Sequence, residues 1–216
     1  MATLLDWNAV SHKVKSYIGE SPYCTAPNRA FTYVALEYLL SLSPEEIEDA
    51  ITDGPNDRGI DAVYVDDRDG RNVIHLFQFK HVNSFVQAKK NFPSTEVDKL
   101  LSFCADLLNQ NSGMKDTCNP ILWTKVQEIW SALRNPTPSF EVHFCANMMA
   151  LVETQKQRVM SALAGYRSFN VNHHTLDSLV RLFIEKKQPK IEAQLRVVDK
   201  NYFERTDGNI RGLIVT

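Results

Sequence analysis

The segment TDGPNDRGIDAVYVDD places Asp53, Asp57 and Asp61 around two glycines and a proline, and then continues into an apolar stretch. Asp61 is the unusual member, because it stands at the start of what reads as a buried strand. An ionised carboxylate is rarely buried without a cation or a hydrogen-bonding partner. The sequence therefore indicates that Asp61 holds something, and the two candidates are the backbone of its own turn and a metal ion.

A second group of polar side chains stands in the run LFQFKH. Because side chains alternate across a strand, Gln78 and Lys80 share one face and the two phenylalanines share the other. The Asp-Gly dipeptide at residues 69–70 predicts a hairpin between the two runs. Antiparallel pairing then places Asp61 opposite residues 76–78, so that Asp61, Gln78 and Lys80 converge at one end of the sheet.

These residue types fit one kind of chemistry. The Asp61 carboxylate, the Gln78 side-chain oxygen and the Phe79 backbone carbonyl are hard oxygen ligands, which Mg²⁺ prefers. Glu37, on the polar flank of the preceding helix, is a candidate to complete the metal shell. Lys80 beside the ion would offset negative charge that builds on a phosphate. The set predicts hydrolysis of a phosphodiester bond with Mg²⁺, or Mn²⁺, as cofactor.

The pattern GIDAVYVDD followed by HLFQFKH, after a helix bearing Glu37, resembles the PD-(D/E)xK nuclease superfamily, in the Mrr-type variant where glutamine replaces the acid of the triplet. ITDGPNDRGIDAVYVDD followed by LFQFKH is most similar to the N-terminal domain of the abortive-infection phage-resistance protein family. The resemblance extends over residues 28–183. It implies a restriction-endonuclease-like fold in which Asp61, Gln78, Lys80 and Glu37 form the catalytic set.

The resemblance further implies cleavage of DNA in phage defence, with Asp57 in a supporting role that orders the turn or holds an outer-shell water. By residue type alone, Asp53 and Asp57 are typical of turns. His81, Lys89 and Lys90 follow the site and are candidate contacts to phosphates. A glutamine oxygen binds Mg²⁺ more weakly than a carboxylate does. A non-catalytic module that binds nucleic acid or protein is therefore the alternative, and an RNA substrate stays open.

The bulk composition is that of a globular protein: the chain has 216 residues, 44% hydrophobic and 23% charged. A formal net charge of −2 gives no global sign of a polyanion partner, although a local basic groove is compatible with it. No apolar run approaches the roughly 20 residues that span a bilayer, and no signal peptide is visible. We therefore predict a soluble, cytoplasmic protein without a membrane partner, and a homodimer is left open.

Histidine and cysteine residues give weaker signals. The four cysteines form no C-x-x-C pair, so buried thiols are expected rather than a zinc site or disulfides. His143 and Cys145 share a strand face, and we expect both in the core rather than in a nucleophile pair. His173 and His174 point to opposite faces if they lie on a strand, so they do not chelate one metal together.

The elements that must position these residues alternate between strands and helices after the predicted hairpin. This order predicts an α/β fold with a restriction-endonuclease-like mixed central sheet and helices on both faces. We divide the chain into a helical extension, a nuclease-like domain and a β-rich segment that starts a further C-terminal domain, at residues 1–27, 28–187 and 188–216. Helices are expected over residues 28–42, 44–51, 96–109, 120–133, 151–166 and 176–186, and strands over residues 59–67, 71–81, 139–147, 168–174, 190–198 and 209–216.

Overall fold

A computed structural model describes residues 2–19, 24–70, 72–134, 138–166, 168–185, 202–207 and 210–215. The chain divides into two units, Met1–Lys186 and Lys187–Thr216. The strands of the first unit are β1 (Ala62–Asp66), β2 (Val73–Lys80), β3 (Ser139–Ala146) and β4 (Phe169–His174). Its helices are α1 (Leu4–Tyr17), α2 (Pro27–Leu40), α3 (Pro44–Ala50), α4 (Phe85–Ala88), α5 (Ser94–Leu108), α6 (Met114–Thr117), α7 (Pro120–Ala132), α8 (Glu153–Leu163) and α9 (Leu176–Glu185).

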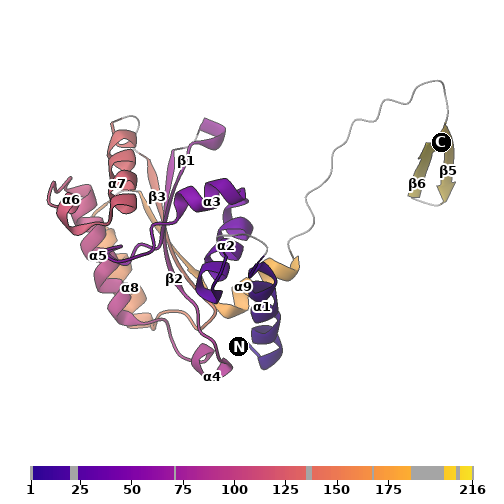
Figure 1. The fold of residues 1–216 in the computed structure, drawn as a ribbon, viewed down its shortest axis with the longest axis horizontal. Helices are drawn as coiled ribbons and strands as arrows, with labels where there is room; N and C mark the ends of the chain where they lie inside the picture. Colours follow the sequence, from indigo (N-terminus) through magenta and orange to yellow (C-terminus); the bar gives the residue numbers. More distant parts are fainter. Residues whose placement is uncertain are drawn as a thin grey trace. The chain divides into compact units, whose positions relative to one another are not determined.

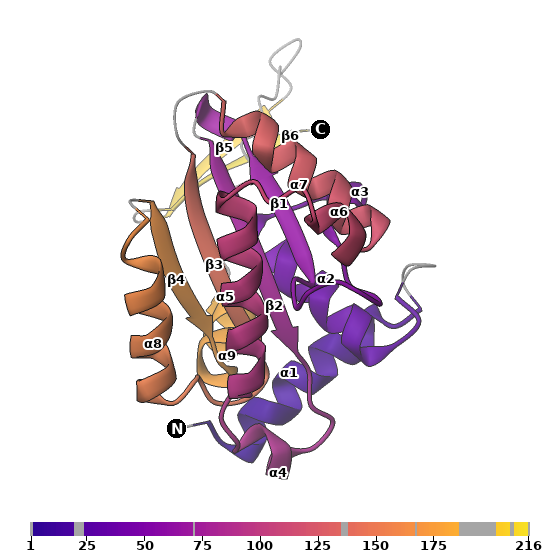
Figure 2. The same ribbon diagram turned by 90° about the vertical axis from the view of Figure 1, so that its left-hand side faces the viewer.

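The first unit is built on a mixed sheet in the order β1-β2-β3-β4. β1 runs antiparallel to β2, whereas β2, β3 and β4 run parallel to one another. Helices cover both faces, with α5, α7 and α8 on one side and α1, α2 and α9 on the other (Figure 1 and Figure 2). This confirms the predicted mixed α/β architecture, and it is consistent with a restriction-endonuclease-like fold.

Alternation of side chains divides the core into two clusters. Ile74 and Leu76 belong to the cluster that contains the apolar residues of α5 and α7. Phe77 and Phe79 belong to the cluster that contains those of α1 and α2. Val10 of α1 lies in that second cluster and is fully buried, so α1 packs as part of the first unit's core. Each face of the sheet therefore carries its own hydrophobic layer.

The β1–β2 register fixes the position of Asp61. Ala62 pairs with Phe77, and the Asp61 N–H donates to the Phe77 carbonyl over 2.9 Å. Asp61 therefore lies opposite Gln78 at the open end of the pair, as the sequence predicts. The connection is a 3₁₀ turn, Arg68–Gly70, rather than a tight two-residue hairpin, and it is held by the Asp66 carboxylate, which accepts from the Arg68 N–H over 3.1 Å.

The helices begin where their capping residues predict. Ser43 precedes α3 and forms a capping box with Glu46, and Pro44 occupies the first turn. Asn119 caps α7 by accepting from the Leu122 N–H over 2.8 Å. All four cysteines are buried and free, as expected.

The second unit contains β5 (Tyr202–Asp207) and β6 (Ile210–Val215), which pair in antiparallel fashion. The strand predicted over residues 190–198 lies outside the described residues. Among the described residues, no helix has both the length and the apolar character needed to span a bilayer.

Candidate active site

The loop before β1 is closed by its own backbone. The N–H groups of Thr52 and Asp53 both donate to the Asp61 carbonyl, over 3.0 and 3.1 Å. Arg58 fixes the outer part of the loop to α5, where its guanidinium lies 2.7 Å from the Asp106 carboxylate. Backbone hydrogen bonds and the Arg58–Asp106 ion pair thus hold the loop, and they fix the position of Asp61.

Asp57 orders this loop. Its carboxylate accepts from the Gly59 N–H over 2.7 Å and from the Gly54 N–H over 3.3 Å. Gly59 has φ +76°, and a Cβ there would lie 2.9 Å from Lys99 Cβ and 3.1 Å from Gln78 Nε2. Glycine is therefore required by both the backbone conformation and the space. The turn-ordering part of the predicted role of Asp57 fits these contacts.

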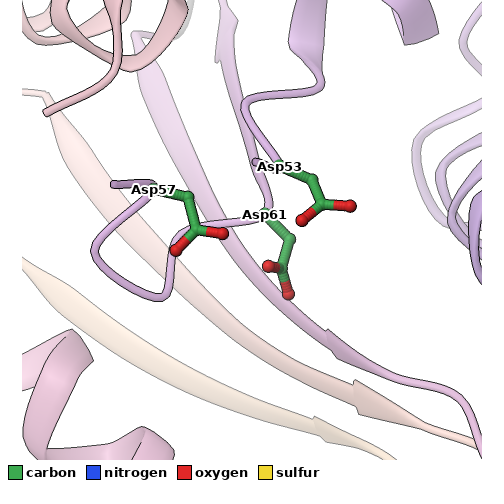
Figure 3. A group of neighbouring side chains, drawn as sticks. All are labelled: Asp53, Asp57 and Asp61. Carbon is green, nitrogen blue, oxygen red and sulfur yellow. The ribbon is translucent and has the colours of Figure 1, made fainter. Parts of the chain in front are cut away.

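The loop also brings three carboxylates together. Asp53, Asp57 and Asp61 each offer an oxygen within 4.8 Å of the others (Figure 3). Burial, reinforced by the charges of Asp53 and Asp57, raises the pKa of Asp61 to about 7, even though its carboxylate accepts a hydrogen bond from the Phe79 N–H. A cation among the three side chains would stabilise the ionised form of Asp61.

A pocket of about 280 Å³ opens beside Asp61 at the end of β2. Lys80 and His81 line it from the strand, and Asp53 and Asp61 line it from the loop. The structure thus brings together Asp61 and Lys80, two members of the predicted catalytic set. The remaining lining residues are Asn28, Phe31, Thr32 and Phe79.

Gln78 does not line this pocket and instead contacts the first turn of α5. It is 1% exposed, and its Nε2 donates to the backbone carbonyl of Glu96 over 3.2 Å and to the Glu96 carboxylate over 3.1 Å. Its Oε1 is buried with no hydrogen-bond partner among the described residues. A buried oxygen in this state is costly unless something binds it, and a cation or a water would do so.

Glu96 is a site residue that the sequence prediction missed. Its carboxylate lies 3.0 Å from Lys80 Nζ and 3.1 Å from Lys99 Nζ, and it also accepts from Gln78. Burial acts to raise the pKa of Glu96, but the two lysines outweigh it and hold that pKa below its usual value. The only sequence signal was an acid in the first turn of α5, with a lysine three residues later.

Glu37 is not brought to the site, which corrects the prediction that it completes the metal shell. Tyr17 of α1 donates a hydrogen bond to its carboxylate. Glu37 lines a separate pocket of about 360 Å³, together with Tyr33 and Leu42. None of the residues that line this pocket also lines the Asp61 pocket. Because α1 packs against α2, the polar flank of α2 that carries Glu37 faces Tyr17 instead of the end of β2.

The three predicted phosphate contacts differ in position. His81 lines the Asp61 pocket, its Nδ1 lies 3.3 Å from Asn28 Oδ1, and burial lowers its pKa. Lys89 and Lys90 are exposed at the end of α4, with Lys89 Nζ 4.6 Å from the centre of the Phe85 ring. Neither lysine lines the pocket.

The donors present fit a hard divalent cation. Oxygen ligands are those that Mg²⁺ and Mn²⁺ prefer, and the loop supplies three carboxylates. Of the predicted ligands, Asp61 belongs to this group, Gln78 contacts Glu96 instead, and Phe79 contributes its N–H to Asp61. Comparisons of this chain with protein families, with curated protein sequences and with solved structures find no match.

Proposed function

We propose that this protein is a Mg²⁺-dependent endonuclease that hydrolyses phosphodiester bonds of DNA in prokaryotic phage defence, as a diverged PD-(D/E)xK nuclease related to the abortive-infection family. The observation that carries the proposal is the meeting of Asp61, Asp53 and Asp57 beside a pocket that Lys80 also lines. The loop before β1 and the end of β2 thereby bring carboxylates and an ammonium group to one end of the sheet.

Bound Mg²⁺ would polarise the scissile phosphate and supply a nucleophile at neutral pH. Asp61 would orient that ion, because its position is fixed by β1 pairing and by the Phe79 N–H. Asp53 is exposed and Asp57 is half-buried, so the former can exchange between water and the ion while the latter keeps the loop closed. The pKa of Asp61, near 7 without a cation, falls when a cation binds.

Lys80 is the group placed to offset charge on the phosphate. Its side chain is 38% exposed, so the ammonium group can reach a ligand in the pocket. Glu96 orients it over 3.0 Å, and Gln78 in turn orients Glu96. We expect Lys80 to contact the reacting phosphate and Glu96 to act as a positioning residue.

The test is cleavage of DNA by the purified protein with Mg²⁺ or Mn²⁺, and its arrest by a chelator. Asp61→Asn removes a charge but keeps the shape, and it should reduce kcat by roughly 100-fold or more. Asp116→Asn, at an exposed aspartate of α6, is the matched control and should cut normally. Undiminished cutting by Asp61→Asn contradicts the assignment. An RNA substrate assayed in parallel decides between the two nucleic acids.

A non-catalytic module that binds nucleic acid is the second candidate. One observation favours it: the acid position of the triplet is Gln78, whose amide nitrogen is bonded to Glu96, while Lys80 is ion-paired with the same carboxylate. Such a module would bind DNA without metal and would keep binding after Asp61→Asn. Its affinity would fall with salt according to the number of phosphates contacted.

A further inference from the structure

A second lysine, to which the proposed function gives no role, stands beside Lys80. Lys99 of α5 has its Nζ 3.1 Å from one oxygen of the Glu96 carboxylate, and Lys80 has its Nζ 3.0 Å from the other oxygen. One carboxylate therefore holds two ammonium groups side by side. We call Lys80, Glu96 and Lys99 the lysine clamp.

The lysine clamp carries one positive charge in excess, because a single carboxylate faces two ammonium groups. Gln78 also donates to this carboxylate, over 3.1 Å, but it brings no charge. The hydrogen bond and the charge of Glu96 raise the pKa of Lys99, and the charges of Asp57 and Asp61 act in the same direction. Lys99 is thus a cation near pH 7, and the clamp suits an anionic ligand.

The stem of Lys99 lies against the loop that carries the three aspartates. A Cβ built at Gly59 would fall 2.9 Å from Lys99 Cβ and 3.2 Å from Lys99 Cδ, so the glycine leaves the space that this stem occupies. The ion pair with Glu96 fixes the other end, at the ammonium group. Packing and charge together keep Lys99 beside the loop.

Lys80 and Lys99 differ in their position relative to the Asp61 pocket. The side chain of Lys80 is 38% exposed and lines the pocket, whereas that of Lys99 is 55% exposed and does not line it. A phosphate in the pocket therefore meets Lys80, and Lys99 lies outside. Phosphates repeat along a nucleic-acid strand, so a strand with one phosphate in the pocket carries further phosphates past its rim.

We propose that Lys99 binds a backbone phosphate next to the scissile one, on the strand that is cut. This rests on the proposed function, which places the scissile phosphate at Lys80. An ammonium group has three N–H donors, so the bond to Glu96 leaves donors for a phosphate. Contacts of this kind position the strand without taking part in bond breaking. The site therefore favours a strand with at least two phosphates over an isolated phosphodiester.

The first measurement is the kinetics of Lys99→Gln on two substrates, a DNA duplex and bis(p-nitrophenyl) phosphate, which is a diester with a single phosphate. On DNA, KM should rise by roughly 10-fold with kcat unchanged, because the lost contact is equally strong before and during the reaction. On the single diester the variant should match the unmodified protein, whereas Lys80→Ala should lose activity on both. A loss of kcat by Lys99→Gln on both substrates overturns the proposal.

The second measurement is binding of labelled DNA to the Asp61→Asn protein by fluorescence anisotropy, at constant Mg²⁺ and between about 50 and 200 mM KCl. Adding Lys99→Gln should weaken binding by roughly 10-fold at the lower salt, whatever the DNA sequence. The fall in affinity over this salt range should shrink by roughly 3-fold, as the loss of one phosphate contact implies. Lys99→Arg should restore most of the affinity, because it keeps the charge.

Lys156→Gln is the matched control. Lys156 of α8 also pairs with a glutamate three residues before it, over 3.4 Å, and its loss should leave DNA binding unchanged. Equal affinity and equal salt dependence with and without Lys99→Gln overturn the proposal, and so does a protein that binds no DNA. DNA binding that depends on Lys99, in a protein that cuts neither substrate, keeps Lys99 as a phosphate contact and overturns the nuclease assignment alone.

Discussion

Two places on the same sheet bury ionisable groups in opposite ways. Near the end of β2, three aspartates gather around a loop, and burial, reinforced by the charges of Asp53 and Asp57, raises the pKa of Asp61 to about 7. In the middle of the sheet, His75 of β2, His143 of β3 and His174 of β4 form a histidine row, in which neighbouring ring nitrogens lie at hydrogen-bond distance. The pKa values of these three histidines are lowered. The first site buries a carboxyl group whose pKa lies near 7, whereas the second buries imidazoles whose pKa values are lowered.

The difference between the two places follows from whether the backbone near each side chain is already hydrogen-bonded within the sheet. Just before β1 begins, beside the end of β2, the Phe79 N–H is left for a side chain, and the Asp61 carboxylate accepts a hydrogen bond from it. Inside the sheet the backbone is already paired, so polar side chains must find partners among themselves. The histidine row does this across β2, β3 and β4. Removing a polar side chain at the end of the sheet should therefore lower catalytic activity. Removing one inside the sheet should lower the stability of the fold.

The largest expected effect is on the rate of DNA cleavage, which should depend on Lys80 and not on the histidine row. Lys80→Ala should lower kcat for DNA cleavage by roughly 100-fold, because it removes the cation next to the reacting phosphate. Lys80→Arg should retain part of the activity, since it restores the charge in a different geometry. Steady-state kinetics measures both. His75→Gln should cut as well as the unmodified protein, and a comparable loss in that variant would mean that the two sites are coupled.

A smaller effect is expected at Glu96. Glu96→Gln keeps the size of the side chain but weakens its hold on Lys80 and Lys99, and we expect kcat to fall by roughly 10-fold with little change in KM. An unchanged kcat would assign Glu96 a purely structural role.

The pH dependence of stability should have opposite signs at the two places. Without metal, folded Asp61 binds its proton up to about pH 7, whereas the unfolded value is near 3.8, so stability falls as pH rises between those values. His174 binds its proton only near pH 4 when folded, against 6.5 unfolded, so stability falls as pH drops below 6.5.

Urea unfolding in chelator, between about pH 4.5 and 7.5, measures both slopes. Asp61→Asn should remove the loss of stability that accompanies rising pH, and His174→Gln should reduce the loss that accompanies falling pH, to which His75 and His143 also contribute. If each variant keeps the parent's profile, neither group is buried in the state described.

The smallest effect concerns the loop alone. Gly59→Ala places a Cβ 2.9 Å from Lys99 Cβ at a residue with φ +76°, and we expect a loss of about 1–2 kcal/mol in the free energy of unfolding. Gly165→Ala has open space and serves as the control, with a change near zero. Equal stabilities for the two variants would show that the loop relaxes without cost.

Much of the sheet could be predicted from the sequence, because alternation and turn signals are local. The opposition of Asp61 and Gln78 follows from the apolar pattern of β1 and β2. The opposite directions of His173 and His174 also follow from alternation: His173 stacks on Phe144, and His174 reaches His143. His143 lies in the core as predicted, but its bonds to two other strands depend on the β2–β3–β4 order, which no local pattern contains.

The errors at the candidate site arise from packing between distant segments. The prediction placed Glu37 at the end of β2 because its helix precedes β1, yet the contact of α1 with α2 turns it to Tyr17. Glu96 comes from a helix after β2, and only the stacking of α5 on the sheet brings it to Lys80. The gathering of Asp53 with Asp61 depends on backbone bonds across the loop.

The central claim is that Asp53, Asp57 and Asp61 hold a divalent cation beside Lys80. Anomalous diffraction from a crystal soaked in Mn²⁺ tests it most directly. The account predicts one manganese peak bonded to an Asp61 oxygen at about 2.2 Å, absent from crystals of Asp61→Asn. Crystals that show no peak at these aspartates, while the unmodified protein still cuts DNA, would contradict it.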